Sequence, residues 1–464
     1  MAAPEQFDAI VIGTGQGGKP LAGAFARAGW RTAILERADL VGGTCVTVGC
    51  TPTKTMVASA RVAYLARRAG EYGVNVGPVT VDQAAVRKRT RAIVDMFSGG
   101  SRRGMERLEH NDLIMGEGRF TGPHDLEVTL NDGSGTRAIR SEKIFLNVGA
   151  RPAPPPVPGL DAVDYLDSTS VMELDEVPTH LVVLGGGFIG LEFGQMFRRF
   201  GSEVTILEMG DKCIRREDRD VAEAIKQIFT EDGIDVRCGN KAKHVSRAAN
   251  GSIAVTVETA EGEAVISGSH LLVAAGRKAN SDSLNLDAAG VEVNARGFII
   301  VNERLETNVP GIWALGDVTG GPAFTHIAYD DYRILKQNVL EGGNATTTGR
   351  LVPYTVFIDP ELGRVGLSED DAKQQGLDYE VVTMPMSHVA RALESDETRG
   401  LMKAVVDAKT KQILGCAILG ISGGELMSML EIAMMGKVSA LELRDAVFSH
   451  PNLSEAFNNL FAKL

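Results

Sequence analysis

The chain has 464 residues, of which 44% are hydrophobic, and its formal net charge is −12 at pH 7. This length predicts two to four globular domains, and the negative charge argues against nucleic acid or an anionic membrane as a partner. No stretch approaches the roughly 18 apolar residues of a membrane span. Five cysteines in so long a chain predict a cytoplasmic protein rather than a disulfide scaffold.

The chain opens with a strand–helix–strand pattern. Phe7–Ile12 and Thr32–Glu36 are short β-branched runs, and Pro20–Gly29 between them has helical composition. Such a succession is typical of a βαβ unit, in which two parallel strands are joined by a helix.

The turn after the first strand contains Gly13, Gly15 and Gly18 in the spacing of a dinucleotide-binding fingerprint. The glycines permit a tight turn and the close approach of a pyrophosphate, and the next helix offers its first amides to the phosphates. Glu36 ends the second strand, where a carboxylate can accept hydrogen bonds from ribose hydroxyls. A glycine triplet alone is often only a turn, but strand, helix and acid together predict a bound dinucleotide.

The same pattern recurs later in the chain. Leu181–Leu184 and Glu203–Glu208 are predicted strands, and Gly190–Phe200 is the predicted helix between them. The second fingerprint consists of Gly185, Gly187 and Gly190, and its acid is Glu208. Two units predict two dinucleotides, a tightly held flavin and a diffusible nicotinamide.

Glu208 favours NAD over NADP, because a carboxylate at this position would repel a 2′-phosphate. Arg215 and Arg216 follow in the next loop. They are interpreted as ordinary surface arginines, but a role in binding that phosphate stays open, so that NADP(H) remains possible.

Cys45 and Cys50 stand five residues apart at a predicted helix start. Such a pair can close a small disulfide ring, and a helix N-terminus favours the reactive thiolate. A zinc site is the alternative, but two cysteines without neighbouring ligands make a poor one. Cys213, Cys238 and Cys416 are scattered along the chain and are interpreted as structural residues.

The segment from Gly42 to Lys54, Gly-Gly-Thr-Cys-Val-Thr-Val-Gly-Cys-Thr-Pro-Thr-Lys, resembles the active-site signature of the pyridine nucleotide-disulfide oxidoreductases. It departs from that signature at Thr47, where the family has asparagine, and at Thr53, where it has serine. The resemblance extends over essentially the whole chain. It includes the segment Thr307–Asp317, which looks like the second flavin motif of the family.

The resemblance implies an α/β fold with two Rossmann-like dinucleotide-binding domains and a C-terminal α+β dimerisation domain. Residues 1–155 and 278–350 would form the FAD-binding and central region. Residues 156–277 would form the NAD(P)-binding domain, and residues 351–464 would hold a homodimer together.

The resemblance also implies which residues contact the two cofactors. The expected FAD contacts are Gly13, Gly15, Gly18, Glu36, Gly43, Thr44, Lys54, Gly118, Gly149, Asp317, Ala323, Thr325 and His326. The expected NAD contacts are Gly185, Gly187, Gly190, Glu208 and Gly276. No metal ligand is expected.

Six residues are implied as catalytic. Cys50 would lie against the flavin and Cys45 would exchange with substrate. Lys54 and Glu192 would pair near the position where hydride arrives. His450 and Glu455, in the segment Ser449–Glu455, would form an acid–base pair that serves the partner subunit's active site.

The electron acceptor is left open between a disulfide, as for dihydrolipoamide dehydrogenase, and a metal ion. Val389–Leu393 resembles mercuric reductase, although His450 stands where that enzyme has tyrosine. Arg216–Asp220 and Tyr329–Arg333 resemble the copper reductases of the bacterial reactive-chlorine response. A flavin-binding redox sensor without turnover is a minor alternative, since a sensor would not need all six catalytic residues.

Overall fold

The first glycine turn lies at the end of a parallel sheet. The computed structural model describes residues 3–464, and the first of its sheets has the strand order β1-β6-β5-β4-β3-β2-β7-β17, in which β1 is Glu5–Gln6. The parallel part consists of β4 (Asn111–Phe120), β3 (Thr32–Glu36), β2 (Ala9–Ile12), β7 (Ile144–Leu146) and β17 (Ile312–Ala314). Its central strands are buried on both faces, as parallel strands covered by helices must be.

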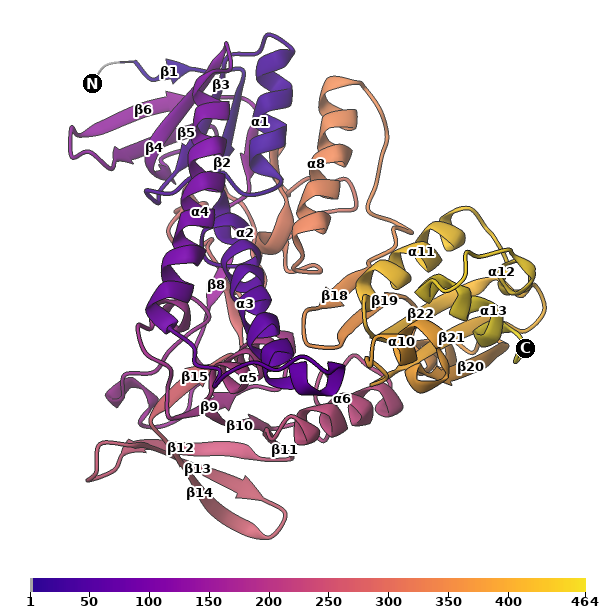
Figure 1. Cartoon of the computed structure of the whole chain (residues 1–464). Helices are drawn as coiled ribbons and strands as arrows, with labels where there is room; N and C mark the ends of the chain where they lie inside the picture. The colour runs from indigo at the N-terminus through magenta and orange to yellow at the C-terminus, as the bar shows by residue number, and fades with distance from the viewer. Residues whose placement is uncertain (1–2) are drawn as a thin grey trace. The chain divides into compact units, whose positions relative to one another are not determined.

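Helix α1 (Gly18–Arg27) packs on β2 and β3 and against α8 (Thr325–Leu340), as Figure 1 shows. The predicted strands and helix of the first unit are therefore confirmed. The sheet continues through β5 (Asp125–Leu130) and β6 (Thr136–Arg140), which are antiparallel. Together with α2 (Gly43–Thr47) and the first residues of α3 (Cys50–Arg68), these elements belong to one compact unit, called here the first unit: Met1–Thr55, Ala85–Ala153 and Gly276–Arg350.

A second unit consists of Met56–Ala84, Pro154–Ala275 and Leu351–Leu464. Its nucleotide-binding part is a parallel sheet of β11 (Asp235–Cys238), β10 (Glu203–Glu208), β9 (His180–Leu184) and β15 (His270–Val273), in that order. Helix α5 (Phe188–Phe200) packs on β9 and β10. The strand–helix–strand pattern predicted for this region is confirmed.

The remaining sheets of the second unit are antiparallel. One is the meander β12 (Lys241–Arg247), β13 (Ile253–Thr259) and β14 (Gly262–Gly268). The other, near the C-terminus, has the order β18-β19-β22-β21-β20. Its strands are Tyr354–Val356, Glu361–Gly366, Ile413–Gly420, Leu401–Asp407 and Tyr379–Pro385. Helix α11 (Gly423–Met435) covers β19 and β22, which completes the predicted α+β layer.

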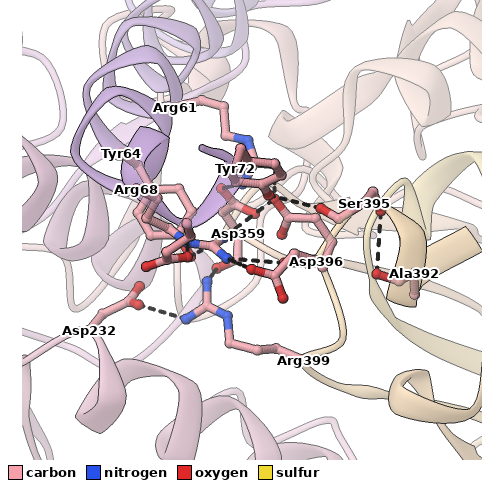
Figure 2. A network of polar contacts seen from close by, with 12 residues as sticks. Arg61, Tyr64, Arg68, Tyr72, Asp232, Asp359, Ala392, Ser395, Asp396 and Arg399 are labelled. Carbon is pink, nitrogen blue, oxygen red and sulfur yellow. Dashed lines mark hydrogen bonds and ion pairs between the residues drawn. The ribbon is translucent and has the colours of Figure 1, made fainter. Parts of the chain in front are cut away.

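A network of charged side chains joins these parts of the second unit (Figure 2). Asp359 accepts a hydrogen bond from Arg61 on α3 (Cys50–Arg68) at 2.5 Å and another from Arg199 on α5. Arg399 donates to Asp232, which follows α6 (Arg219–Glu231), at 2.6 Å. Burial opposes ionisation of Asp359, but the two guanidinium groups outweigh it and hold the pKa of this carboxyl below its usual range. The network thereby fixes α3 and the nucleotide-binding sheet to the C-terminal sheet.

Candidate active site

The two cysteines of the predicted redox pair lie on consecutive helices. Cys45 lies on α2 (Gly43–Thr47), and Cys50 is the first residue of α3. Cys45 is partly buried, Cys50 is exposed, and the two sulfurs are not joined in a disulfide. A hydrogen bond with Cys50, together with burial, raises the pKa of the Cys45 thiol above its ordinary value. The two side chains are therefore adjacent, as a pair that forms and breaks a disulfide must be.

Two further groups act on these thiols. The hydroxyl oxygen of Thr325 lies 3.3 Å from the Cys50 sulfur and also hydrogen-bonds with Cys45. The ammonium group of Lys19 attracts negative charge on Cys45, so that Thr325 and Lys19 partly offset the rise in the pKa of Cys45. Sequence reasoning missed Lys19, and the one signal available was its position directly after the last glycine of the first fingerprint.

The first glycine loop leaves no room for a side chain at Gly13 or Gly18. Gly13 has φ = 106°, and a Cβ on it would lie 2.4 Å from the carbonyl oxygen of Asn147. A Cβ on Gly18 would lie 2.1 Å from the carbonyl oxygen of Gly13. The side chain of Asn147 accepts a hydrogen bond from the Gly18 amide at 2.8 Å. The loop is thus held tightly against the sheet, as close approach of a pyrophosphate requires.

Glu36 closes this loop from the end of β3. One of its carboxylate oxygens accepts hydrogen bonds from the amide of Thr14, at 3.2 Å, and from the Thr14 hydroxyl. The other oxygen accepts from the Ala38 amide at 3.0 Å. The carboxylate stands beside the glycine turn, which is where a ribose acceptor is expected.

Asp317 lies on the short 3-10 helix Gly316–Thr319. Burial raises the pKa of its carboxyl, although the Arg277 guanidinium 3.5 Å away acts in the opposite direction. A partly buried carboxyl with a long ionic contact is suited to accept hydrogen bonds from the hydroxyl groups of a ligand. The glycine loop, Glu36 and Asp317 therefore fit the adenosine and sugar-alcohol parts of FAD.

The other residues predicted to contact FAD lie in the same unit. Gly43 has φ = 64°, and a Cβ on it would lie 2.6 Å from the Cα of Gly15. The His326 ring stacks on the ring of Phe324, with centroids 5.4 Å apart. Four further positions are Thr44 on α2, Gly118 on β4, Gly149 in the turn before β8 (Ala150–Pro152), and the exposed Ala323 just before α8.

The second glycine loop repeats the first in its backbone but differs in its surroundings. Gly185 has φ = 114°, and a Cβ on Gly190 would lie 1.9 Å from the carbonyl oxygen of Gly185. A Cβ on Gly187, by contrast, would meet no atom within 4 Å. This glycine therefore faces open space at the start of α5, which fits the phosphates of a dinucleotide. Gly276, in the first unit, precedes β16 (Arg277–Ala279).

Glu208 ends β10 beside this loop. Its carboxylate accepts hydrogen bonds from the amides of Gly186, at 2.8 Å, and Gly210, at 2.7 Å. Arg215 forms an ion pair with the same carboxylate, at 3.2 Å. Of the two arginines considered for a 2′-phosphate, Arg215 is thus engaged with the acid that would repel that phosphate.

His450 and Glu455 are brought together at the C-terminus. The His450 Nδ1 atom lies 2.9 Å from Glu455 Oε2 and 3.2 Å from Oε1. The histidine ring remains largely exposed, with 69% of its side chain accessible. A carboxylate on Nδ1 orients the ring and leaves Nε2 to exchange a proton.

Glu192 is buried on α5 of the second unit, where its carboxylate accepts a hydrogen bond from the Phe357 amide at 2.9 Å. Lys54 lies on the first turns of α3, in the first unit. Their pairing stays a prediction.

Two protein-family models match most of the chain. A model of the family described as "Pyridine nucleotide-disulphide oxidoreductase" matches residues 7–331. The model of that family's dimerisation domain matches residues 352–461. The chain belongs to the pyridine nucleotide-disulphide oxidoreductases.

Several relatives from this family match over nearly the whole chain. The probable pyridine nucleotide-disulfide oxidoreductase RclA of Escherichia coli (strain K12) is 38% identical, over 98% of this chain and 99% of its own. A mercuric reductase of Bacillus cereus is 34% identical, over 97% and 70%. A dihydrolipoyl dehydrogenase of Halobacterium salinarum is 34% identical, over 97% and 94%. A solved structure described as the Cu(II) complex of the HOCl-induced flavoprotein disulfide reductase RclA has a TM-score of 0.90 and 38% identity, and covers 99% of this chain and 100% of its own.

Membership of the family confirms the predicted fold class and the resemblance. The chain is an oxidoreductase of a flavoprotein disulfide reductase family that uses FAD and a pyridine nucleotide, and its C-terminal region is a dimerisation domain. Among residues 3–464, no helix combines the length and the apolar composition needed to cross a membrane.

Proposed function

We propose that this protein uses NADH to reduce the Cys45–Cys50 pair and passes the electrons on to a disulfide substrate. The observation that supports the proposal most directly is the adjacency of the Cys45 and Cys50 thiols on α2 and α3, with the Thr325 hydroxyl in contact. FAD, when bound, supplies the two-electron chemistry that links a nicotinamide to a dithiol. We propose that the FAD residues predicted above, from Gly13 to His326, hold this cofactor.

The dithiol step is a thiol–disulfide exchange. The Cys45 thiolate attacks one sulfur of the substrate disulfide, which forms a mixed disulfide and releases one substrate thiol. The Cys50 thiolate then attacks the Cys45 sulfur, which releases the second substrate thiol and leaves a Cys45–Cys50 disulfide. The raised pKa of Cys45 supports this division of roles, because a thiol with a raised pKa needs a base before it can attack.

His450 is the proposed base. It takes the proton of Cys45 or of the substrate thiol through Nε2 and returns it to the leaving thiolate, while Glu455 stabilises the imidazolium. The exposure of His450 supports a role outside its own subunit. We propose that residues 351–464 form a homodimer in which His450 serves the partner's Cys45.

Complementation between subunits tests this proposal. His450→Ala and Cys45→Ser each remove one half of the site, so each protein alone should lack disulfide reductase activity. When the two are dissociated and reassociated together, heterodimers should regain up to about half the activity of a wild-type dimer. Each variant reassociated alone is the control. Inactive heterodimers, under conditions in which wild type survives, would contradict the cross-subunit base.

The proposal also covers the preferred nucleotide, the residues that contact it and the assignment of domains. Glu208 and its pairing with Arg215 support NADH over NADPH. Gly185, Gly187, Gly190 and Gly276 are proposed to contact the nucleotide. Lys54 and Glu192 are proposed to pair where hydride arrives. We assign residues 1–155 and 278–350 to FAD and residues 156–277 to NAD(P), and propose a cytoplasmic location.

Reduction of Cu(II) is the second candidate, because the similar RclA structure, with a TM-score of 0.90, is a Cu(II) complex. The metal ion would be a substrate of the same dithiol. Purified protein with NADH should be assayed in parallel with lipoamide, glutathione disulfide, Hg(II) and Cu(II). A kcat/KM for Cu(II) well above those for both disulfides would replace the first candidate with the second.

A further inference from the structure

Two cysteines interpreted as scattered structural residues form a second thiol pair. The sulfur atoms of Cys213 and Cys238 lie 3.7 Å apart, although 25 positions separate them in the chain. Cys213 follows β10 in the loop before α6, and Cys238 is the last residue of β11. Cys213 is buried and Cys238 is partly exposed. Within residues 3–464, no cluster of three or more histidine, cysteine or acidic side chains forms a metal site, so that the pair is a dithiol rather than half of such a centre.

The pair encloses the acid of the second nucleotide-binding unit. Cys238 is the strand partner of Glu208 in the register of β10 and β11. The amide of Asn240 donates to the Glu208 carbonyl at 2.9 Å, and the amide of Gly239 donates to the carbonyl of Gly210. On the other side, Cys213 lies in the loop that carries Arg215, the ion-pair partner of Glu208.

Cys213 also touches the glycine loop itself. Its sulfur would lie 3.1 Å from a Cβ on Gly186, and the next residue, Ile214, donates its amide hydrogen to the Gly186 carbonyl at 3.0 Å. Gly186 in turn donates to Glu208. A displacement of the segment that holds Cys213 and Ile214 would therefore act through these contacts on the loop and the carboxylate that we propose for the nucleotide.

We propose that Cys213 and Cys238 form a thiol–disulfide switch that controls binding of the pyridine nucleotide. The inference rests on the proposed function, because it takes Gly187 and Glu208 as nucleotide contacts. A disulfide brings its sulfur atoms to about 2.05 Å, whereas these two lie 3.7 Å apart, so closure must shorten their separation by about 1.6 Å and move at least one of them by about 0.8 Å. The loop that holds Arg215 and touches Gly186 shifts with Cys213.

The chemistry needs one two-electron oxidant, such as a peroxide. The partly exposed Cys238 reacts first: its thiolate attacks the peroxide oxygen, which gives a sulfenic acid and, from hydrogen peroxide, one water after protonation. Cys213 then attacks that sulfur, a second water leaves, and the disulfide remains. Two thiols are oxidised by two electrons, and a dithiol reductant reverses the step. A lowered pKa of Cys238, to about 7, supports this order; its largest cause is the hydrogen bond from Cys213.

The test uses the full-length Cys45→Ser/Cys50→Ser variant with FAD bound, so that Cys213 and Cys238 are the only close thiol pair described. After hydrogen peroxide treatment and alkylation of free thiols, peptide mass spectrometry should find Cys213 linked to Cys238. Calorimetry should show that oxidation weakens binding of NAD⁺ about tenfold, the size expected for loss of one hydrogen bond to a charged group. Dithiothreitol should restore the affinity.

Two further variants in this background serve as controls. Cys238→Ser should bind NAD⁺ normally and become insensitive to peroxide. Cys416→Ala removes a buried cysteine of the C-terminal sheet and should keep the full response. Absence of the linked peptide, or a linked peptide without change in affinity, overturns the switch while the proposed function stands. Failure of the reduced protein to bind NAD⁺ overturns the nucleotide site and the switch together.

Discussion

The two glycine loops share one plan and differ at the residue after the first glycine, among other positions. In each, a glutamate at the end of the second strand accepts a hydrogen bond from the amide next to the first glycine. The distance is 3.2 Å from Thr14 to Glu36 and 2.8 Å from Gly186 to Glu208. In both loops, the carboxylate thus connects the glycine turn to the end of the second strand by a hydrogen bond.

The difference is the side chain at that amide. Thr14 is fully buried; its hydroxyl donates to Glu36 and accepts from the Gly42 amide at 2.9 Å. Gly186 has no side chain, and the Cys213 sulfur packs against it instead. The first loop is therefore locked by a group of fixed chemistry, which suits a tightly held cofactor. The second is supported by a group whose chemistry can change, which suits a ligand that binds and leaves.

The largest expected effect separates the two cysteine pairs, because Cys45 and Cys50 are proposed to carry electrons whereas Cys213 and Cys238 are not. Cys45→Ser and Cys50→Ser should each lower disulfide reduction on the order of a thousandfold or more, because no internal disulfide can form. The reduced wild type should show a long-wavelength band of thiolate next to flavin. Cys45→Ser should show it without reductant, and Cys50→Ser should not show it at all.

Cys238→Ser is the matched control for these variants, and its turnover in the absence of oxidant should stay within about twofold of wild type. Steady-state rates with NADH and a disulfide give the comparison. A thousandfold loss in Cys238→Ser would mean that the second pair, not the first, carries the electrons.

Two glycines of the second loop offer a sharper test, since alanine at Gly190 should lower stability and alanine at Gly187 should weaken nucleotide binding. Gly190→Ala places a methyl group 1.9 Å from a backbone oxygen, and should lower the free energy of unfolding by about 3 kcal/mol or more. Gly187→Ala meets no atom within 4 Å. It should leave stability within about 0.5 kcal/mol and raise the Kd for NAD⁺ about tenfold by obstructing the phosphates.

Denaturant unfolding and calorimetry separate the two effects in the glycine variants. Equal stability losses in both would show that Gly187 is needed for the turn rather than for a ligand.

The nucleotide preference is a smaller effect. NADH should exceed NADPH in kcat/KM by roughly ten- to hundredfold, because Glu208 repels an added phosphate and favours ribose hydroxyls. Arg215→Ala should preserve or widen that ratio, since Arg215 is paired with Glu208. The two nucleotides are to be compared at equal pH and salt. Equal values, or a preference for NADPH in wild type, would mean that Arg215 and Arg216 bind the 2′-phosphate.

The smallest effect concerns the reactivity of the second thiol pair. The pKa of Cys238 is lowered to about 7 by the hydrogen bond with Cys213, while the pKa of Cys213 is raised by the same hydrogen bond and by burial. Alkylation requires the thiolate. Its rate at Cys238 should therefore rise about tenfold between pH 6 and pH 8, while Cys213 stays nearly unreactive. Time-resolved peptide mapping with iodoacetamide measures both rates. An unchanged rate at Cys238 across that range would contradict the shift.

Much of the fold followed from local patterns. Both glycine turns with their strands and helices were predicted within a few residues, because each fingerprint, strand and helix is a contiguous segment with its own periodicity. His450 and Glu455 were paired correctly for the same reason, since only five positions separate them. Cys45 and Cys50 likewise lie within one short stretch.

Other features depend on contacts between distant segments. Lys19 and Thr325 act on Cys45 from the start of α1 and of α8, and Arg61 reaches Asp359 across 298 positions. Such contacts cannot be predicted from the composition of the chain or from the spacing of its residues. An arginine or a lysine is exposed more often than not, so that solvent exposure was the reasonable expectation for each.

By itself, the sequence determined the two strand–helix–strand units with their glycine turns, the proximity of Cys45 and Cys50, and the family, since each depends on short contiguous segments. The tertiary structure alone decided that Cys213 and Cys238 meet. Their contact is set by the parallel register of β10 and β11 and by the path of the loop before α6. The physical reason is that strand register depends on side-chain packing between segments, which one-dimensional spacing does not encode.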